Sequence, residues 1–253
     1  MRFQKKLSRR VLSLAAALVT GISSVGIGSL SGGVLLASAE EDTSTHEHSY
    51  DTGNTNGFCD VEGCTEPYQP AEDSDGDGTY EIANAGQLYW FAEQVVNGEV
   101  SLNAIFTADI VVNEGDVAGC NGTKDASWRD WTPIGDGYYG YKGTFDGQGH
   151  TISGLYFYGE CNPDEDQFDG EDVGIVRKLN DSGVIQNVGL ENSYFYGETE
   201  VAGICGRNSG GIIRNCYNTA TITCENIIVG GIVGYSYGTV RACVHKRFKS
   251  VTA

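Results

Sequence analysis

Positive charge is scarce in this chain outside its first ten residues. Five of its 16 Lys and Arg residues lie between Arg2 and Arg10, so eleven remain against 34 Asp and Glu. Of these acids, 29 lie between Glu40 and Asp172, and only five follow. Such a surface would repel phosphate backbones and anionic membranes, so we expect no nucleic-acid partner. Calcium ions and uncharged glycans remain as candidate ligands.

Three further patterns are missing. No apolar run after Leu36 is long enough to cross a membrane, so we expect no membrane span once the leader is removed. The H-E-x-x-H motif of zinc peptidases is absent, because the only His-Glu pair is His46-Glu47. No helical periodicity appears after Gly143, where short β-branched runs alternate with Gly, Asn and Ser turns. We therefore expect a β-rich chain without a peptidase site or an organic cofactor.

The first 39 residues have the pattern of a signal peptide. A basic stretch from Arg2 to Arg10 precedes an apolar stretch from Val11 to Leu36, and Ala37-Ser38-Ala39 is a small-residue cleavage site. A membrane anchor is the alternative, because the apolar stretch is long enough to span a bilayer. The glycines within this stretch and the cleavage site favour removal after Ala39. The mature protein is then expected to be secreted or held at the cell surface.

One amphipathic helix is predicted in the acidic segment 73–142, which leads into the repeats. Asn84 and Gln87 have the spacing of a capping box, and Asn97-Gly98 supplies a stop. Between them, apolar residues recur at i, i+3, i+4 and i+7, which is the spacing of one buried helix face. The predicted elements are strands at 80–82 and 103–112 and a helix with apolar positions Leu88, Phe91, Ala92 and Val95.

Between residues 143 and 244 the sequence repeats itself. The segments VGIVRKLNDSGVIQNVGL, VAGICGRNSGGIIRNCYN and VGGIVGYSYGTVRACV begin at Val173, Val201 and Val229. Self-similarity at a period of about 28 residues is typical of stacked architectures, in which no repeat buries its apolar face alone. We therefore expect equivalent residues to lie directly above one another at the strand spacing of about 4.8 Å.

The stacked arrangement predicts particular columns of side chains. Asn187 above Asn215 would form a ladder of side-chain amides. Four glycines in the repeats would permit tight corners, and the helix would cover the open end of the stack. The first predicted column consists of Ile175, Ile204 and Ile232. The second consists of Val188, Cys216 and Cys243, with Leu155 as its continuation in the preceding repeat. The four glycines are Gly203, Gly206, Gly231 and Gly234.

The stretch WTPIGDGYYGYKGTFDGQGHTISGL, from Trp131 to Leu155, resembles the opening segment of GLUG-motif repeat proteins. The repeats at Val201 and Val229 resemble GLUG repeats, and DGDGTYEIANAGQLYWFAEQV resembles the segment that commonly precedes them. Such repeats occur in large exported bacterial proteins, including adhesin-like surface proteins and the N-terminal regions of IgA-specific metallopeptidases. The resemblance implies that each repeat forms one coil of a right-handed parallel β-helix. We predict an all-β chain of this kind, with about three and a half coils and one N-terminal amphipathic capping helix.

A Cys/His segment at 40–72 carries candidate metal ligands. His46, His48, Cys59 and Cys64 supply two imidazoles and two thiols, the four donors of a tetrahedral structural zinc site. The pattern resembles a short Cys/His module in exported proteins of anaerobic Gram-positive bacteria, although four residues separate the cysteines here and two are usual. A local Cys59–Cys64 disulfide and a disordered linker are the alternatives.

Asp73, Asp75 and Asp77 have the D-x-D-x-D-G pattern that begins a calcium loop. Carboxylates at alternate positions can converge on a hard cation, and Gly78 permits the turn. Asn84 stands where an EF-hand has its bidentate Glu, so the segment is not an EF-hand. A partial calcium site and a polar hinge before the helix are the two interpretations.

Two other groups of residues bear on function. Six acids between Asp164 and Asp172 form an insertion that we interpret as a solvated loop, because glycosidase chemistry needs two carboxylates fixed across a groove. Tyrosine-rich triplets at 138–141, 156–158 and 194–196 should place rings on the outer face of the strands. Such rings can pair across neighbouring coils or stack on sugar faces.

The sequence therefore predicts a non-catalytic, exported module that is adhesin-like and binds a glycan or a host or cell-surface protein. A β-helix polysaccharide lyase or glycoside hydrolase is one alternative. A truncated fragment of a larger surface protein is another, because the repeat stops after Cys243 and an irregular basic tail follows at 245–253. An uncovered last coil would then favour self-association.

Overall fold

The computed structural model describes residues 48, 50, 56–59, 61, 62, 64–135, 137–159, 170–226 and 228–246. All of them belong to the compact unit His46–Ala253, one of two into which the chain divides. Several predicted features lie outside the described residues, and these are the leader at 1–39, His46, the acids at 164–169 and most of the tail at 245–253.

Helix α1 (Ala85–Val96) forms where the sequence predicts it. The Asn84 side chain accepts a hydrogen bond from the backbone N–H of Gln87 (2.9 Å), and the Gln87 side chain accepts one from the N–H of Ala83 (2.7 Å). These two bonds form the predicted cap, with the return bond displaced by one residue. All four predicted apolar positions are buried. Gly98 follows the end of the helix with a φ of 120°.

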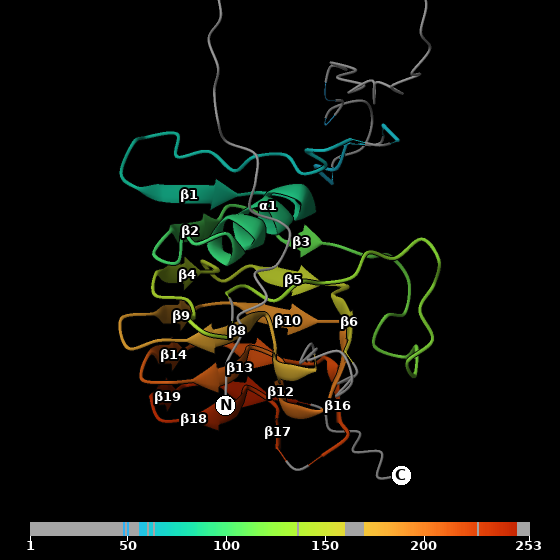
Figure 1. The fold of residues 1–253 in the computed structure, drawn as a ribbon, viewed down its shortest axis with the longest axis vertical. Helices are drawn as coiled ribbons and strands as arrows, with labels where there is room; N and C mark the ends of the chain where they lie inside the picture. The colour runs from blue at the N-terminus through green and yellow to red at the C-terminus, as the bar shows by residue number, and fades with distance from the viewer. Residues whose placement is uncertain are drawn as a thin grey trace, which may run out of the picture. The chain divides into compact units, whose positions relative to one another are not determined.

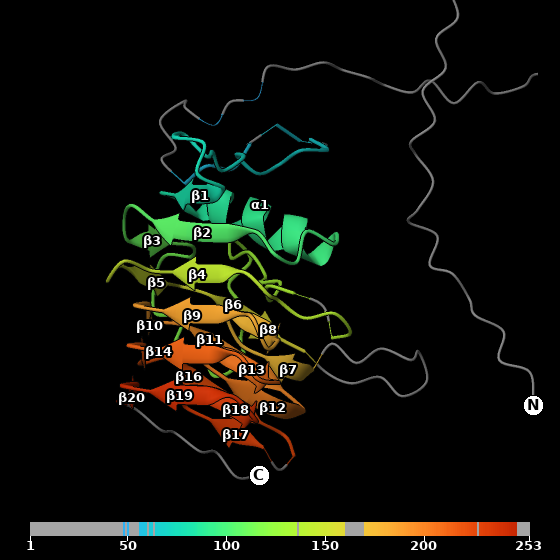
Figure 2. The same cartoon turned by 90° about the vertical axis from the view of Figure 1, so that its left-hand side faces the viewer.

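The named strands lie in five sheets, and neighbouring strands within each sheet are parallel. The largest sheet has six strands in the order β1-β2-β4-β9-β14-β19, which Figure 2 shows one below another. Its members are β1 (Thr79–Ile82), β2 (Asn103–Phe106), β4 (Thr144–Asp146), β9 (Val184–Gln186), β14 (Ile212–Arg214) and β19 (Thr239–Arg241).

The other four sheets are smaller. The five-stranded sheet contains β3 (Ile110–Val111), β5 (Thr151–Ser153), β10 (Gly189–Glu191), β15 (Tyr217–Asn218) and β20 (Val244–His245). Three sheets have three strands each: β6 (Tyr156–Tyr158), β11 (Tyr194–Gly197) and β16 (Thr221–Cys224); β7 (Glu171–Val173), β12 (Thr199–Ala202) and β17 (Val229–Gly230); β8 (Val176–Leu179), β13 (Cys205–Asn208) and β18 (Val233–Ser236).

The chain visits the five sheets in a fixed sequence. Strands β9 to β13 pass through all five in turn, and β14 to β18 pass through them again. Equivalent residues therefore pair directly, as Ile185 does with Ile213 and Ile213 with Val240. These steps of 28 and 27 residues are those of the sequence repeat. The predicted stacking of one repeat on the next is confirmed.

The stack begins before the recognisable sequence repeats. Strand β2 pairs with both β1 and β4, and β3 pairs with β5. The prediction of one strand over 103–112 is wrong, because the chain bends at residues 107–109 and passes from the six-stranded into the five-stranded sheet. Beyond β3, an isolated parallel bridge joins Ile134 to Val176, so the loop before β4 continues the pairing beside β8.

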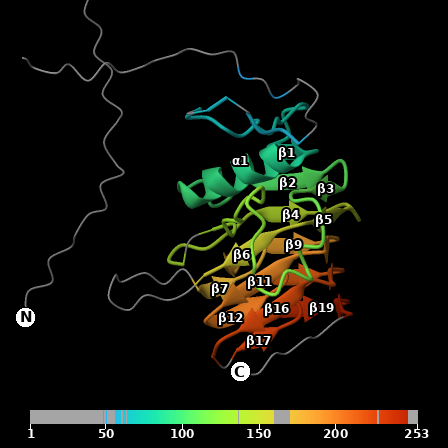
Figure 3. The same ribbon diagram turned by 90° about the vertical axis from the view of Figure 1, so that its right-hand side faces the viewer.

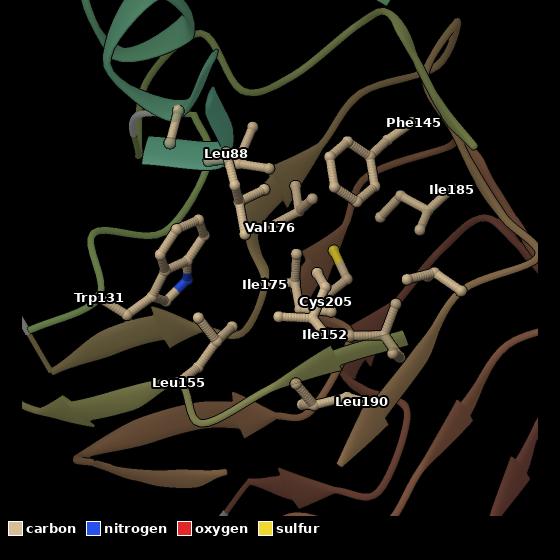
Figure 4. Packing of buried hydrophobic residues seen from close by; sticks show 14 of the residues in the cluster. Leu88, Trp131, Phe145, Ile152, Leu155, Ile175, Val176, Ile185, Leu190 and Cys205 are labelled. Atoms are coloured by element: carbon tan, nitrogen blue, oxygen red, sulfur yellow. The ribbon is translucent and has the colours of Figure 1, made fainter. Parts of the chain in front are cut away.

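The first predicted apolar column is confirmed. Ile175 and Ile204 are fully buried, and Ile232 is half-buried against the same core. The backbone N–H of Val176 donates to the backbone oxygen of Ile204, and the N–H of Ile204 donates to the backbone oxygen of Ile232. The three repeats are therefore in register at this column. Figure 4 shows Ile175 and Val176 among core residues that are distant from them in the sequence, such as Leu88 of helix α1 and Cys205 of β13.

The second predicted column is correct for Val188, Cys216 and Cys243. The first two are buried and the third is half-buried. Continuing this column to Leu155 is wrong, because the backbone N–H of Leu155 donates to Oγ of Ser193 (2.9 Å). The reason is the register of the first repeat: β4 is the strand that pairs with β9, and Ile152 of β5 lies opposite Leu190 of β10, so Leu155 falls beyond the position of Val188.

The predicted amide ladder is present. Nδ2 of Asn215 donates to Oδ1 of Asn187 (3.1 Å), and Nδ2 of Asn187 donates to Oδ1 of Asp146 (2.9 Å). Asn187 and Asn215 have φ values of 52° and 53°, a left-handed conformation that Asn tolerates better than most residues. Ala242 takes the next equivalent position with a φ of 51° and has no amide to extend the ladder.

The repeat glycines serve a different purpose from the one predicted. None of the four has a positive φ, so they do not supply left-handed corners. A Cβ at Gly203 would lie 2.2 Å from the Asn218 side chain, and one at Gly206 would lie 2.2 Å from the backbone of Asp172. Close approach between repeats excludes a side chain at these positions. The four glycines concerned are Gly203, Gly206, Gly231 and Gly234.

The described residues thus form a mostly β structure with parallel sheets and a single helix. Helix α1 lies beside β1 and β2 (Figure 1). Its Phe91 ring contacts those of Tyr141 (6.1 Å between centroids) and Phe145 (6.0 Å). In this part of the chain, no helix has the length and apolar character needed to cross a membrane.

Candidate functional site

Strands β6, β11 and β16 lie one below another in Figure 3 and form one sheet. Two columns of aromatic side chains lie on this sheet. Phe157 pairs with Phe195, and both are buried, so alternate residues of these strands face inward. The outward columns are Tyr156, Tyr194 and Thr221, and Tyr158, Tyr196 and Thr223.

The tyrosines of each column stack on one another. The ring centroids of Tyr158 and Tyr196 are 4.4 Å apart with an interplanar angle of 10°, and those of Tyr156 and Tyr194 are 5.8 Å apart at 17°. The predicted pairing of aromatic rings across repeats is confirmed. The two columns differ in exposure, because Tyr156 is buried whereas Tyr158 is 43% exposed.

The loop between β3 and β4 covers the buried column. Val117 packs on Tyr156 and Tyr194, and the Tyr156 hydroxyl donates to the backbone oxygen of Gly122 (3.1 Å). The Thr221 hydroxyl donates to the backbone oxygen of Ala118 (2.7 Å). The loop is therefore fastened to strands of three successive repeats.

A groove of about 510 Å³ opens between this loop and the exposed tyrosine column. Its chemistry is aromatic and neutral, because every lining side chain is a tyrosine, a threonine or an asparagine apart from one glycine. Burial raises the pKa of Tyr156 beside it to about 12 and also raises that of Tyr194, so both hydroxyls keep their protons at neutral pH. The groove is lined chiefly by Tyr158, Tyr194 and Tyr196 from the sheet and by Asn121, Thr123 and Thr223.

The structure brings together three of the four predicted zinc ligands. One donor atom from each of His48, Cys59 and Cys64 lies within 4.8 Å of the other two. Nδ1 of His48 is 3.5 Å from Sγ of Cys64, and Nε2 of the same ring is 3.7 Å from a carboxylate oxygen of Glu66. His46, the fourth predicted ligand, lies outside the described residues.

The three predicted calcium ligands also lie close together, since carboxylate oxygens of Asp73, Asp75 and Asp77 are within 4.8 Å of one another. Oδ1 and Oδ2 of Asp73 accept hydrogen bonds from the backbone N–H groups of Asp77 (3.0 Å) and Gly78 (2.9 Å). Asp77 in turn accepts one from the N–H of Thr79 (2.8 Å). The polar-hinge interpretation accounts for these bonds, and calcium binding stays a prediction.

A charged cluster that the sequence did not reveal lies across β7, β12 and β13. Arg207 donates to Oδ1 of Asp172 (3.1 Å) and to Oε1 of Glu200 (2.7 Å). Burial and, after it, the Asp172 carboxyl raise the pKa of Glu200 to about 8, so Glu200 is mostly protonated at neutral pH. Glu171 and Asp172, predicted to lie in a solvated loop, belong to strand β7 instead. The 28-residue step from Asp172 to Glu200, which equals the repeat period, could have predicted that these two acids lie next to each other.

The fold defines a class of protein, that of stacked repeats joined by parallel strands. Within it, the profile of the GLUG motif matches residues 197–223, which run from the end of β11 into β16. The predicted resemblance to GLUG-motif repeat proteins is therefore confirmed.

A curated relative and a solved structure add to this comparison. Halomucin of Haloquadratum walsbyi is 32% identical over 171 residues, which are 63% of this chain and 2% of the relative. The chain thus spans about 2% of the length of that relative. A crystal structure described as a "putative immunoglobulin A1 protease" from Bacteroides ovatus covers 72% of this chain and 80% of its own, with a TM-score of 0.38 and 17% identity. That TM-score is too low to establish a shared fold. The motif and the halomucin similarity indicate a surface or secreted repeat protein.

Proposed function

We propose that this chain is a non-catalytic, exported repeat module that binds an uncharged glycan in the groove beside the exposed tyrosine column. The observation that carries the proposal is the stacked pair of Tyr158 and Tyr196, which forms one wall of that groove. Adhesion to a glycan-bearing surface is the role that such a module would perform.

The chemistry of the groove suits a neutral sugar. Aromatic faces pack against the C–H faces of pyranose rings, and hydroxyl and amide groups bond to sugar hydroxyls. Asn121, Thr123 and Thr223 supply such groups around the tyrosines. A volume of about 510 Å³ falls within the range of small-molecule pockets, about 300–1,000 Å³. The formal charge of −18 disfavours acidic polysaccharides.

A right-handed parallel β-helix is the architecture that we propose for the whole stack. The order in which the chain visits the sheets supports it, because successive strands of each sheet are parallel and joined by a full turn of chain. Such crossover connections are right-handed in about 98% of cases. The leader pattern at 1–39 and the GLUG motif support export of the module.

Binding can be tested on an array of neutral and acidic oligosaccharides, followed by calorimetry with the best ligand. We expect Tyr158→Ala to weaken binding at least about tenfold, or about 1.4 kcal/mol, and Tyr158→Phe to retain it. Tyr138→Ala is the matched control, because Tyr138 is 79% exposed and lies outside the groove. Equal affinity for Tyr158→Ala and Tyr138→Ala, or no binding to any neutral glycan, would contradict the proposal.

A polysaccharide lyase or hydrolase is the second candidate, since Asp172 and Glu200 form a pair of carboxyl groups. Both interact with Arg207, and their side chains are only 13% and 8% exposed, which favours a structural role. Release of reducing or unsaturated sugar ends from a polysaccharide panel would separate the two candidates. Activity that is lost in Glu200→Gln would replace the binding proposal with an enzymatic one.

A further inference from the structure

The segment before β1 gathers three metal-binding side chains from positions 48 to 64. Cys59 is buried, Cys64 is half-buried, and the His48 side chain is 32% exposed. Their donor atoms lie within 4.8 Å of one another. The His48 ring stacks on Tyr50 (5.4 Å between ring centroids), and neither His48 nor Cys64 belongs to the buried core cluster, so packing against that cluster does not account for the convergence.

The spacing of these atoms matches a tetrahedral zinc site. Zinc binds thiolate sulfur at about 2.3 Å and imidazole nitrogen at about 2.0 Å, so sulfur and nitrogen ligands of one tetrahedral ion lie about 3.5 Å apart. The distance between Sγ of Cys64 and Nδ1 of His48 is 3.5 Å. Two sulfur ligands would lie about 3.8 Å apart by the same geometry, which the 4.8 Å limit accommodates.

The groups behind the ligands also have the arrangement expected around zinc. A histidine that binds zinc through one ring nitrogen usually donates its other N–H to a carboxylate. Here Nδ1 of His48 faces Cys64, and Nε2 faces Oε2 of Glu66 at 3.7 Å.

The segment has a fixed base on which a metal site can be built. Phe58, next to Cys59, is fully buried and packs edge-on against Tyr68 and Tyr89. The guanidinium of Arg129 lies 3.9 Å from the centroid of the Phe58 ring. The N–H of Cys59 donates to the backbone oxygen of Pro67 (2.8 Å), which closes the loop that carries both cysteines.

We propose that His48, Cys59 and Cys64 bind one structural Zn²⁺, which fastens this segment to the N-terminal end of helix α1. The two thiols lose their protons to the solvent on binding, and a water molecule can fill the fourth position. Thiolate ligands favour zinc over calcium or magnesium, which prefer oxygen. The ion would stabilise the segment and take no part in ligand binding at the tyrosine groove.

The test measures the metal content of the untagged full chain after purification and dialysis. We expect about one zinc per chain, falling to background in both Cys59→Ser and Cys64→Ser. Cys224→Ser is the control, because that half-buried cysteine lies outside the cluster. Replacing zinc with Co²⁺ should produce thiolate-to-metal charge-transfer absorption that the same two variants abolish.

A second pair of variants separates binding from mere folding of the segment. Glu66→Gln should weaken zinc affinity about 10- to 100-fold while leaving the circular dichroism spectrum unchanged. Glu62→Gln, an exposed neighbour in the same loop, should leave the affinity unchanged. Zinc at background in the wild-type chain, or zinc content equal in Cys59→Ser and the wild type, would overturn the proposal. A thiol count that shows Cys59 and Cys64 oxidised to a disulfide, with no bound metal, would overturn it as well.

Discussion

Replacing Ile204 by Ala should lower the free energy of unfolding by about 2–5 kcal/mol. The side chain is fully buried between Ile175 and Ile232 of the neighbouring repeats. The substitution removes three buried carbon atoms, which at about 0.8 kcal/mol each account for about 2.4 kcal/mol. The rest of the cost comes from the cavity that the substitution leaves. The neighbouring repeats cannot close this cavity, because hydrogen bonds join the backbone N–H of Ile204 to the oxygen of Ile232 (3.1 Å) and the N–H of Val176 to the oxygen of Ile204 (3.0 Å).

The stack supplies its own control. Ile232 occupies the equivalent position one repeat later but is half-buried, so Ile232→Ala should cost about half as much or less. Ile204→Val removes a single methyl group and should cost about 0.5–1.5 kcal/mol. Urea unfolding can be followed by tryptophan fluorescence, to which Trp131, 2% exposed in the folded protein, contributes with two other tryptophans. Equal costs for Ile204→Ala and Ile232→Ala would refute the stacked register.

Three further predictions concern charge, backbone conformation and exposed strands. Because folding raises the pKa of Glu200 from 4.5 to about 8, the free energy of unfolding should fall as pH rises across that range, by at most about 1.4 kcal/mol per pH unit. Urea titrations at several pH values should show that this pH-dependent fall is missing in Glu200→Gln. Ala242→Asn should raise the free energy of unfolding by about 0.5–1 kcal/mol, since Asn suits the left-handed φ and extends the ladder; a decrease would contradict the ladder argument. Strands β17, β19 and β20 form sheet edges among the described residues and expose Val229, Val240 and Val244. Sedimentation should therefore detect self-association that Val244→Lys reduces, and an unchanged distribution of oligomers in that variant would show that β20 is not the contact.

The elements with a strong local pattern could be predicted from the sequence. The cap at Asn84 and the apolar face of α1 both lie in or next to the twelve residues of the helix, so local sequence was enough to predict it. The register of the later repeats follows from their similarity, because Ile185 and Ile213 occupy equivalent positions. The first repeat was harder, because β4 is the strand that pairs with β9 and β5 pairs with β10, which places Leu155 beyond the column predicted for it.

The candidate sites divide in the same way. The triplets of tyrosines revealed the stacked rings, but the loop that forms the other wall of the groove has no periodicity. Its position depends on contacts such as the hydrogen bond from Thr221 to Ala118, which joins residues 103 positions apart. Composition and spacing were enough to single out Cys59 and Cys64 as candidate ligands, and their proximity to His48 and that of Glu66 became visible only in the folded segment.

The most direct test of the glycan proposal is an NMR titration of protein labelled with ¹³C at its 14 tyrosines. Addition of the best neutral oligosaccharide should shift the ring signals of Tyr158 and Tyr196, because both rings line the groove in which the sugar would bind. The signals of Tyr138 and Tyr139, which are exposed but lie outside the groove, should not move. Shifts confined to Tyr138 and Tyr139, or no shift at any tyrosine at saturating sugar, would contradict the account.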